Sequence, residues 1–179
     1  MSKAIDDLMH EHQAILSTLR ILQKAIIMLK KNSEINMNDL NSLISFLKEF
    51  ADKCHHGKEE GYLFPAFEAA GIPNENGPIG VMLREHELGR SYIKQMSDSL
   101  AKTKADEHFL MAAEKYVALL RSHIEKENNI LFPMGASRLS AEQLDDLFKK
   151  FEKYEEEVIG KGRHQELHQI LHELENKFF

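Results

Sequence analysis

Two stretches of the sequence place apolar residues at alternating steps of three and four, from Ile5 to Leu29 and from Ile79 to Leu100. This spacing keeps the apolar side chains on one face, as in helices packed lengthwise on their neighbours. In each stretch a histidine takes one of these positions, His12 in the first and His86 in the second. The chain is therefore expected to fold as packed helices that carry histidine in their buried seams.

The sequence also contains one phrase in two near-copies. Residues 55–65 read HHGKEEGYLFP and residues 123–133 read HIEKENNILFP. In both copies a histidine precedes a glutamate by four positions, which places the two side chains on the same face of a helix. The matched positions are His55/His123, Lys58/Lys126, Glu59/Glu127, Leu63/Leu131, Phe64/Phe132 and Pro65/Pro133. The repetition predicts two related helix pairs, each with an inward His–Glu pair.

Breaks between the periodic segments predict an all-α chain. Four long helices over about 3–136 are joined by short connections, which indicates an up-down antiparallel four-helix bundle. Ser140 to Gln143 form a capping box that opens a fifth helix. Glycines at 160 and 162 end it, and a short last helix is expected over roughly 163–177. We expect one domain over 1–179, in which about 140–177 form a helical appendage to the bundle.

Composition excludes several classes of protein. The chain has 179 residues, a net charge of −6 and one cysteine, Cys54. The sequence has neither the basic stripe typical of nucleic-acid binding nor an apolar run long enough to span a membrane. A single cysteine cannot form an internal disulfide, which fits a reducing compartment. We therefore expect a cytoplasmic protein with no nucleic-acid or membrane partner; the sequence identifies no protein partner.

The second helix offers two overlapping pairs with the same spacing, His55…Glu59 and His56…Glu60. His55 shares an apolar stripe of its helix, whereas His56 lies one turn from Asp52 and one turn from Glu60. The apolar stripe points inward, and the alignment with the second copy of the phrase selects the same pair. We therefore expect His55 and Glu59 to face the core.

Four helices would then send four histidines and two glutamates into one interior: His12, His55, His86, His123, Glu59 and Glu127. Burying so many ionisable groups without partners is very unfavourable. Bound metal ions remove this cost, because neutral imidazole and carboxylate become ligands. Six ligands exceed the needs of one tetrahedral zinc ion. The set predicts a dinuclear centre with bridging carboxylates, and its mixed nitrogen and oxygen ligands suit iron or manganese without excluding zinc.

Together these motifs resemble the hemerythrin-like proteins of the HHE cation-binding family over about residues 5–135. The resemblance implies a four-helix bundle around a carboxylate-bridged non-heme di-iron centre. It further implies that the four histidines are terminal ligands and the two glutamates are bridges. The matching motifs are Glu11-His12, His55-x-x-x-Glu59 with Leu63-Phe64-Pro65, Glu85-His86, and His123-x-x-x-Glu127 with Leu131-Phe132-Pro133.

The sequence departs from the oxygen-carrying members of that family. Those proteins have a fifth histidine four residues after the third-helix histidine, where this chain has Arg90. They also bridge with an aspartate five residues after the last histidine, where this chain has Glu127 at four. The chain therefore resembles the bacterial branch with four histidines and two glutamates. One metal ion would then be left with an open position. His56 could supply the fifth nitrogen, because a related iron-sensing domain uses a ligand directly after its second-helix histidine. The favoured interpretation is that His56 faces solvent.

The remaining chemical groups receive plainer interpretations. Cys54 is read as a buried filler, and Tyr62 and Tyr116 as packing residues that stand near the ligands. His10, Lys58 and Lys126 are expected to face solvent, as is the histidine stripe of the last helix, His164, His168 and His172.

Three functions remain open at this stage. The protein could bind or sense oxygen, nitric oxide or iron. It could be a di-iron redox enzyme of a peroxidase-like or iron–sulfur repair-related kind, acting on peroxide or a diatomic ligand. It could also be a bundle that holds another divalent metal.

Overall fold

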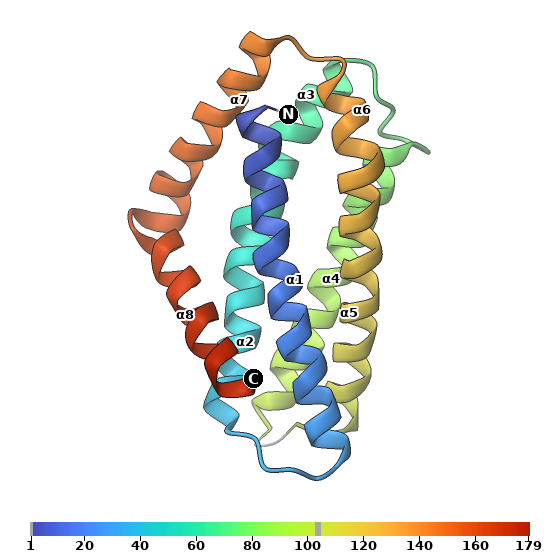
Figure 1. Ribbon diagram of the computed structural model, residues 1–179. Helices are drawn as coiled ribbons and strands as arrows, with labels where there is room; N and C mark the ends of the chain where they lie inside the picture. Colours follow the sequence, from blue (N-terminus) through green and yellow to red (C-terminus); the bar gives the residue numbers. More distant parts are fainter. Residues whose placement is uncertain (1, 103–104) are drawn as a thin grey trace.

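The structure, a computed structural model, describes residues 2–102 and 105–179 and contains helices but no strand in those ranges. Four long helical rods run side by side (Figure 1). The first rod is α1 (Lys3–Lys30) and the third is α4 (Pro78–Leu100). The second rod consists of α2 (Met37–Phe46), η1 (Leu47–His56), η2 (Glu59–Leu63) and α3 (Phe64–Ala69). The fourth consists of α5 (Glu107–Lys126), η3 (Glu127–Leu131) and α6 (Phe132–Ala136). The predicted four-helix bundle is confirmed.

The ends of the rods follow from local sequence. Asn36 and Asp106 accept hydrogen bonds from backbone N–H groups of the first turns of α2 and α5. Pro78 stands in the first turn of α4, where its missing N–H costs nothing. The predicted capping box of Ser140 and Gln143 is present, with both reciprocal bonds formed.

The η segments are π-helical, with wider turns than an α-helix, and two of them end just before the prolines of the repeated phrase. The N–H of Phe64 bonds to the carbonyl of Glu59, and the N–H of Phe132 bonds to the carbonyl of Glu127, five residues back in each case. Inside an α-helix, a proline ring clashes with the carbonyl four residues before it. We infer that the wide turn relieves this clash, so the proline opens a new α-helical segment. Such π turns are frequent at functional sites.

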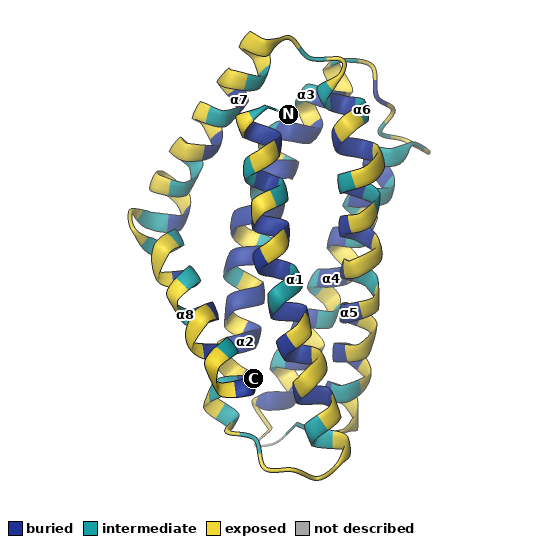
Figure 2. Ribbon diagram, in the orientation of Figure 1, coloured by how far each residue is buried: buried dark blue, intermediate teal, exposed yellow. Residues whose placement is uncertain are grey.

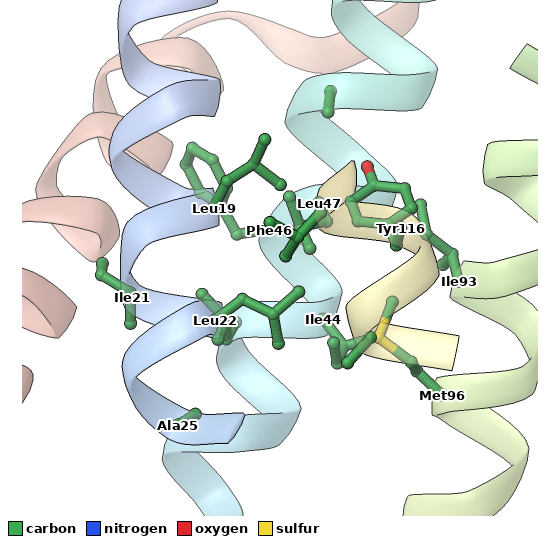
Figure 3. Packing of buried hydrophobic residues seen from close by; sticks show 14 of the residues in the cluster. Leu19, Ile21, Leu22, Ala25, Ile44, Phe46, Leu47, Ile93, Met96 and Tyr116 are labelled. Atoms are coloured by element: carbon green, nitrogen blue, oxygen red, sulfur yellow. The ribbon is translucent and has the colours of Figure 1, made fainter. Parts of the chain in front are cut away.

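The bundle interior contains two apolar clusters separated along its length. The larger cluster includes Leu19, Leu22, Phe46 and Met96, and Figure 3 shows how these side chains interdigitate. The smaller cluster lies towards the other end and includes Leu8, Phe64, Phe67, Phe132 and Phe151. Figure 2 shows that the exposed residues lie on the outer faces of the rods.

The last two helical segments lie along one side of the bundle. They consist of α7 (Ala141–Tyr154), η4 (Glu155–Gly160) and α8 (Arg163–Phe178). Both α7 and α8 pack on α1, while α8 also contacts α2 and η4 contacts η1 (Figure 1). Gly160 and Gly162 lie between η4 and α8 and adopt positive φ angles of 117° and 80°. Because a helix requires negative φ, the helix ends there. None of the described helices combines the length and apolar character needed to cross a membrane.

Candidate metal centre

Polar side chains from all four rods meet at one level between the two apolar clusters. All are buried, and the most exposed of them, His56, has only 3% of its surface accessible. We call the following seven residues the inner layer: His12, His55, His56, Glu59, His86, His123 and Glu127. The structure thus brings together all six ligands expected from the sequence and adds His56 to them.

One half of the inner layer gathers around His12 and His55. Their Nε2 atoms lie 2.9 Å apart. Glu127 Oε2 is 3.2 Å from His12 Nε2, and Glu59 Oε1 is 3.4 Å from His55 Nε2. The ligand atoms of these four residues all lie within 4.8 Å of one another. A single cation can therefore contact all four; we call this the first position.

The other half gathers around His86 and His123, whose Nε2 atoms lie 3.2 Å apart. Glu59 Oε2 is 3.3 Å from His86 Nε2, and Glu127 Oε2 is 3.3 Å from His123 Nε2. His56, Glu59, His86 and His123 form a second group within the same 4.8 Å limit. Glu59 turns one oxygen to each half, and Glu127 lies against a histidine of each half. The geometry defines a second possible cation position that shares Glu59 with the first, and Glu127 lies beside it against His123.

The two carboxylates lack hydrogen-bond donors. None of the four side-chain oxygens of Glu59 and Glu127 accepts a hydrogen bond, although all four are buried. Burial alone raises the pKa of Glu127, but His123 and His12 hold that pKa well below its ordinary value, so the carboxylate stays ionised. Buried anions without donors are costly unless a cation neutralises them. The inner layer therefore has the donor set and the charge of a metal site.

The expectation that His56 faces solvent was wrong. Its ring stacks on that of His86, with centroids 3.8 Å apart and planes inclined by 13°. Its Nε2 is buried and has no hydrogen-bond partner. Burial and the neighbouring His86 lower the pKa of His56 well below its ordinary value, so the ring is neutral and Nε2 can offer a lone pair. The π-helical turns of η1 bring both His55 and His56 to the inner side of the rod.

Each of the four histidines predicted as ligands makes a hydrogen bond through Nδ1 to a side-chain oxygen outside the inner layer. Each turns Nε2 to the inner layer and Nδ1 to an acceptor outside it. The pairs are His55 with Glu11, His123 with Glu85, His86 with Glu60, and His12 with Asn128, at 2.8, 2.9, 2.7 and 2.7 Å. An acceptor at Nδ1 fixes the tautomer that leaves the Nε2 lone pair free for a metal.

These acceptors follow the internal repeat, and sequence reasoning did not identify them. Glu11 and Glu85 each precede the histidine of their own rod, and each accepts from the histidine of the next rod. Glu60 and Asn128 follow the two shared carboxylates directly. The doubled Glu-His pair was a visible signal for the first two, whereas the partners of Glu60 and Asn128 depend on how the rods pack.

The two repeated lysines contact the glutamates that accept from His55 and His123, and Lys58 does not face solvent as expected. Lys58 is fully buried, and its Nζ donates to Glu11 Oε1 at 2.7 Å. Lys126 occupies the matching place and donates to Glu85, but 34% of its side chain is accessible. Each half of the repeat therefore contains a His–Glu–Lys series, buried in one half and near the surface in the other.

Arg90 does not enter the inner layer, where the oxygen carriers place a fifth histidine. Its guanidinium donates to Asp52 at 2.8 Å and to Glu60 at 2.6 Å. Asp52 lies 3.4 Å from His56 Nδ1, and Glu60 accepts from His86. Arg90 therefore contacts the carboxylates that lie beside two histidines, while His56 lies with Glu59, His86 and His123 in the second group.

Aromatic rings border the inner layer. Phe132 stacks on His12 and Phe64 on His86, with centroids 5.5 and 5.7 Å apart. Tyr116 packs between Leu47 and Ile93 in the larger cluster (Figure 3), and its buried hydroxyl lacks a partner. Burial raises the pKa of Tyr116, so the hydroxyl remains protonated.

The other singled-out residues lie outside the inner layer. Tyr62 instead contacts the rings of Phe151 and Tyr154. Cys54 is buried, with its thiol 3.9 Å from Glu11. His10 and His172 are exposed as expected, but His164 and His168 are only partly exposed and lie against the ring of Phe50.

A buried layer of histidine and carboxylate between four antiparallel helices defines a metal-binding helical bundle. The family model described as hemerythrin HHE cation binding domain matches residues 3–135, and the chain belongs to this family. Similar proteins include uncharacterized proteins of Mycobacterium bovis and Mycobacterium tuberculosis, each 26% identical over 167 residues. These matches cover 89% of this chain and 64% of the relatives, so the chain spans less than two thirds of their length. No solved structure matches the chain significantly.

Proposed function

We propose that the inner layer binds two iron ions and that the loaded protein binds or senses a small ligand such as oxygen, nitric oxide or peroxide. The observation that carries this proposal is the meeting of five imidazole rings with four carboxylate oxygens that have no donor. Neutral imidazole and carboxylate are ligands that suit iron, and the set is too large for one tetrahedral zinc ion. The single buried cysteine fits the reducing cytoplasm as its location.

The ligands divide unequally between the two positions. His12 and His55 belong to the first position, and His56, His86 and His123 belong to the second. Glu59 and Glu127 are shared between them. The first position therefore has one protein ligand fewer, and an exogenous ligand is expected to bind there. When bound, the iron pair would supply an open coordination site and electrons for a diatomic or peroxide ligand.

The surrounding residues support binding in a closed, rigid site. The outer acceptors hold four Nε2 atoms in place, which lowers the entropy lost when a metal binds. The stacked rings of Phe132 and Phe64 cover His12 and His86 and help exclude water. These features favour reversible ligand binding or sensing; turnover of peroxide would instead indicate a redox enzyme.

The test is metal content and spectrum of the protein purified from iron-rich cells. We expect two irons per chain and absorption bands of an oxo-bridged diferric pair after exposure to air. The variant Glu127→Gln should lose these bands, whereas Glu125→Gln, an exposed neighbour, should keep them. One tightly held zinc, or no metal in the wild type, would contradict the proposal. A peroxide assay of the loaded protein then separates a binding protein from an enzyme.

A further inference from the structure

A continuous series of charged groups connects His55 of the inner layer to the C-terminal helices. His55 Nδ1 donates to Glu11 Oε2 at 2.8 Å, and Lys58 Nζ donates to Glu11 Oε1 at 2.7 Å. The same ammonium donates to Glu155 Oε1 of η4 at 2.7 Å. Asp7 lies 3.2 Å from it and is partly exposed. Lys58 is thus a fully buried cation held between a glutamate of the bundle and a glutamate of the C-terminal segment.

The C-terminal segment is fitted to this part of the second rod. The hydroxyl of Tyr154 donates a hydrogen bond to the backbone carbonyl of Lys53 in η1 at 2.7 Å. A Cβ at Gly57 would lie 2.2 Å from that hydroxyl, so the contact requires glycine. Tyr154 and Glu155 therefore contact adjacent parts of the rod, beside His55 and His56. The match to the mycobacterial relatives covers 89% of this chain, whereas the family model ends at residue 135, so the match reaches into these helices.

The other half of the repeat provides an internal comparison. Lys126 pairs with Glu85, which accepts from His123, in the same arrangement. The side chains of Lys126 and Glu85 are 34% and 18% accessible, against 0% and 1% for Lys58 and Glu11. Water and salt screen the exposed pair, while the buried pair acts on its surroundings through a low dielectric. The two positions of the centre therefore have unequal electrostatic surroundings.

We propose that Lys58, clamped by Glu155, is a positioning residue that sets the reduction potential of the metal centre through Glu11 and His55. The C-terminal helices are then part of the centre, because they supply Glu155 and bury the ammonium. This inference rests on the proposed function, since it requires iron in the inner layer. An oxidised centre carries more positive charge than a reduced one. A buried cation nearby therefore disfavours oxidation, and a buried anion favours it.

The test compares midpoint potentials of the iron-loaded full chain in redox titrations followed by absorption. Lys58→Gln removes the cation and should lower the midpoint potential by about 59 mV for one electron. This shift corresponds to about a tenfold change in the ratio of oxidised to reduced centre. Glu155→Gln removes an anion and should raise the potential. Lys58→Arg keeps the charge and should restore the wild-type value. Lys126→Gln is the matched control and should shift the potential much less.

Shifts of opposite sign are the signature of a charge effect, because a merely structural loss moves both variants in one direction. Equal potentials for wild type and Lys58→Gln, with two irons in each, would overturn the inference. A Lys126→Gln shift as large as that of Lys58→Gln would overturn it as well. If Lys58→Gln does not fold, the inference is tested with Glu155→Gln. A midpoint potential of Glu155→Gln that is no higher than that of Lys126→Gln would then reject the inference. A wild type without iron would refute the proposed function instead.

Discussion

The ring of His56 stacks on the ring of His86, with 3.8 Å between centroids, and its unpaired Nε2 joins the second group of ligands. We propose that His56 is the fifth nitrogen ligand of the centre. We expect His56→Ala to reduce bound iron from two per chain towards one, measured by metal analysis after gel filtration. His172→Ala, on an exposed residue, is the control and should keep both ions. Full iron content in His56→Ala would remove it from the ligand set.

Arg90 is expected to act on the centre only through the carboxylates it braces. Arg90→Met keeps the aliphatic stem but frees Asp52 and Glu60, which lie behind His56 and His86. Loss of such outer contacts typically costs 10–100-fold in metal affinity. We expect iron to pass to a chelator about tenfold faster than in wild type. Lys94→Met, one turn further along α4 and paired with Asp98 only at the surface, should leave the rate unchanged.

The substitution Arg90→His gives a separate expectation. A histidine at this place was expected from the sequence to complete an open position, but His56 already occupies the second group. Arg90→His should therefore leave two irons per chain and leave azide affinity within a factor of about three, measured by absorption titration. Tightened metal binding with a new ligand band would show that the second position was incomplete.

Gly135 allows α6 to pack against α3. A Cβ at Gly135 would lie 2.2 Å from Cζ of the buried Phe67 ring, which has no room to move. We expect Gly135→Ala to lower the free energy of unfolding by about 1–3 kcal/mol. The melting temperature should then fall by about 2–4 °C per kcal/mol. In Gly61→Ala the added methyl meets nothing within 4 Å, and this control should be neutral or more stable.

Metal-free protein should lose stability as the pH rises. Burial opposes protonation of His55 and His123, but Glu59 and Glu11 raise the pKa of His55 to about 10, and Glu127 raises that of His123 to about 10. The ordinary histidine pKa of 6.5 applies to the unfolded chain. The stabilisation is therefore complete below pH 6.5 and disappears as the pH rises to about 10.

The measurement is the melting temperature of the chelator-treated protein between pH 6.5 and 10. A fall of several degrees is expected, corresponding to about 2–4 °C for each kcal/mol lost. The iron-loaded protein should not show this fall, because its ligands are already deprotonated. Parallel curves for the two forms would contradict the assignment of these histidines to the metal site.

The sequence alone predicted the helices and the level at which their polar residues meet. The 3–4 spacing around His12 and His86 is a local property of each helix, so burial of the apolar seam carries the histidine inward with it. The spacing of His55 to Glu59 and of His123 to Glu127 is local in the same sense. These positions required no knowledge of how the rods pack against one another.

Tertiary structure decided the burial and the partners of those residues that α-helical spacing placed on the wrong face or left without a partner. The π-helical turns of η1 brought His56 inward, although an α-helical register places it on the acidic side of its rod. Lys58 matches the repeat of Lys126, yet only Lys58 is fully buried, because α7 and η4 cover that flank and supply Glu155. Burial and long-range partners depend on which surface is covered by segments distant in the sequence, and local periodicity does not contain that information.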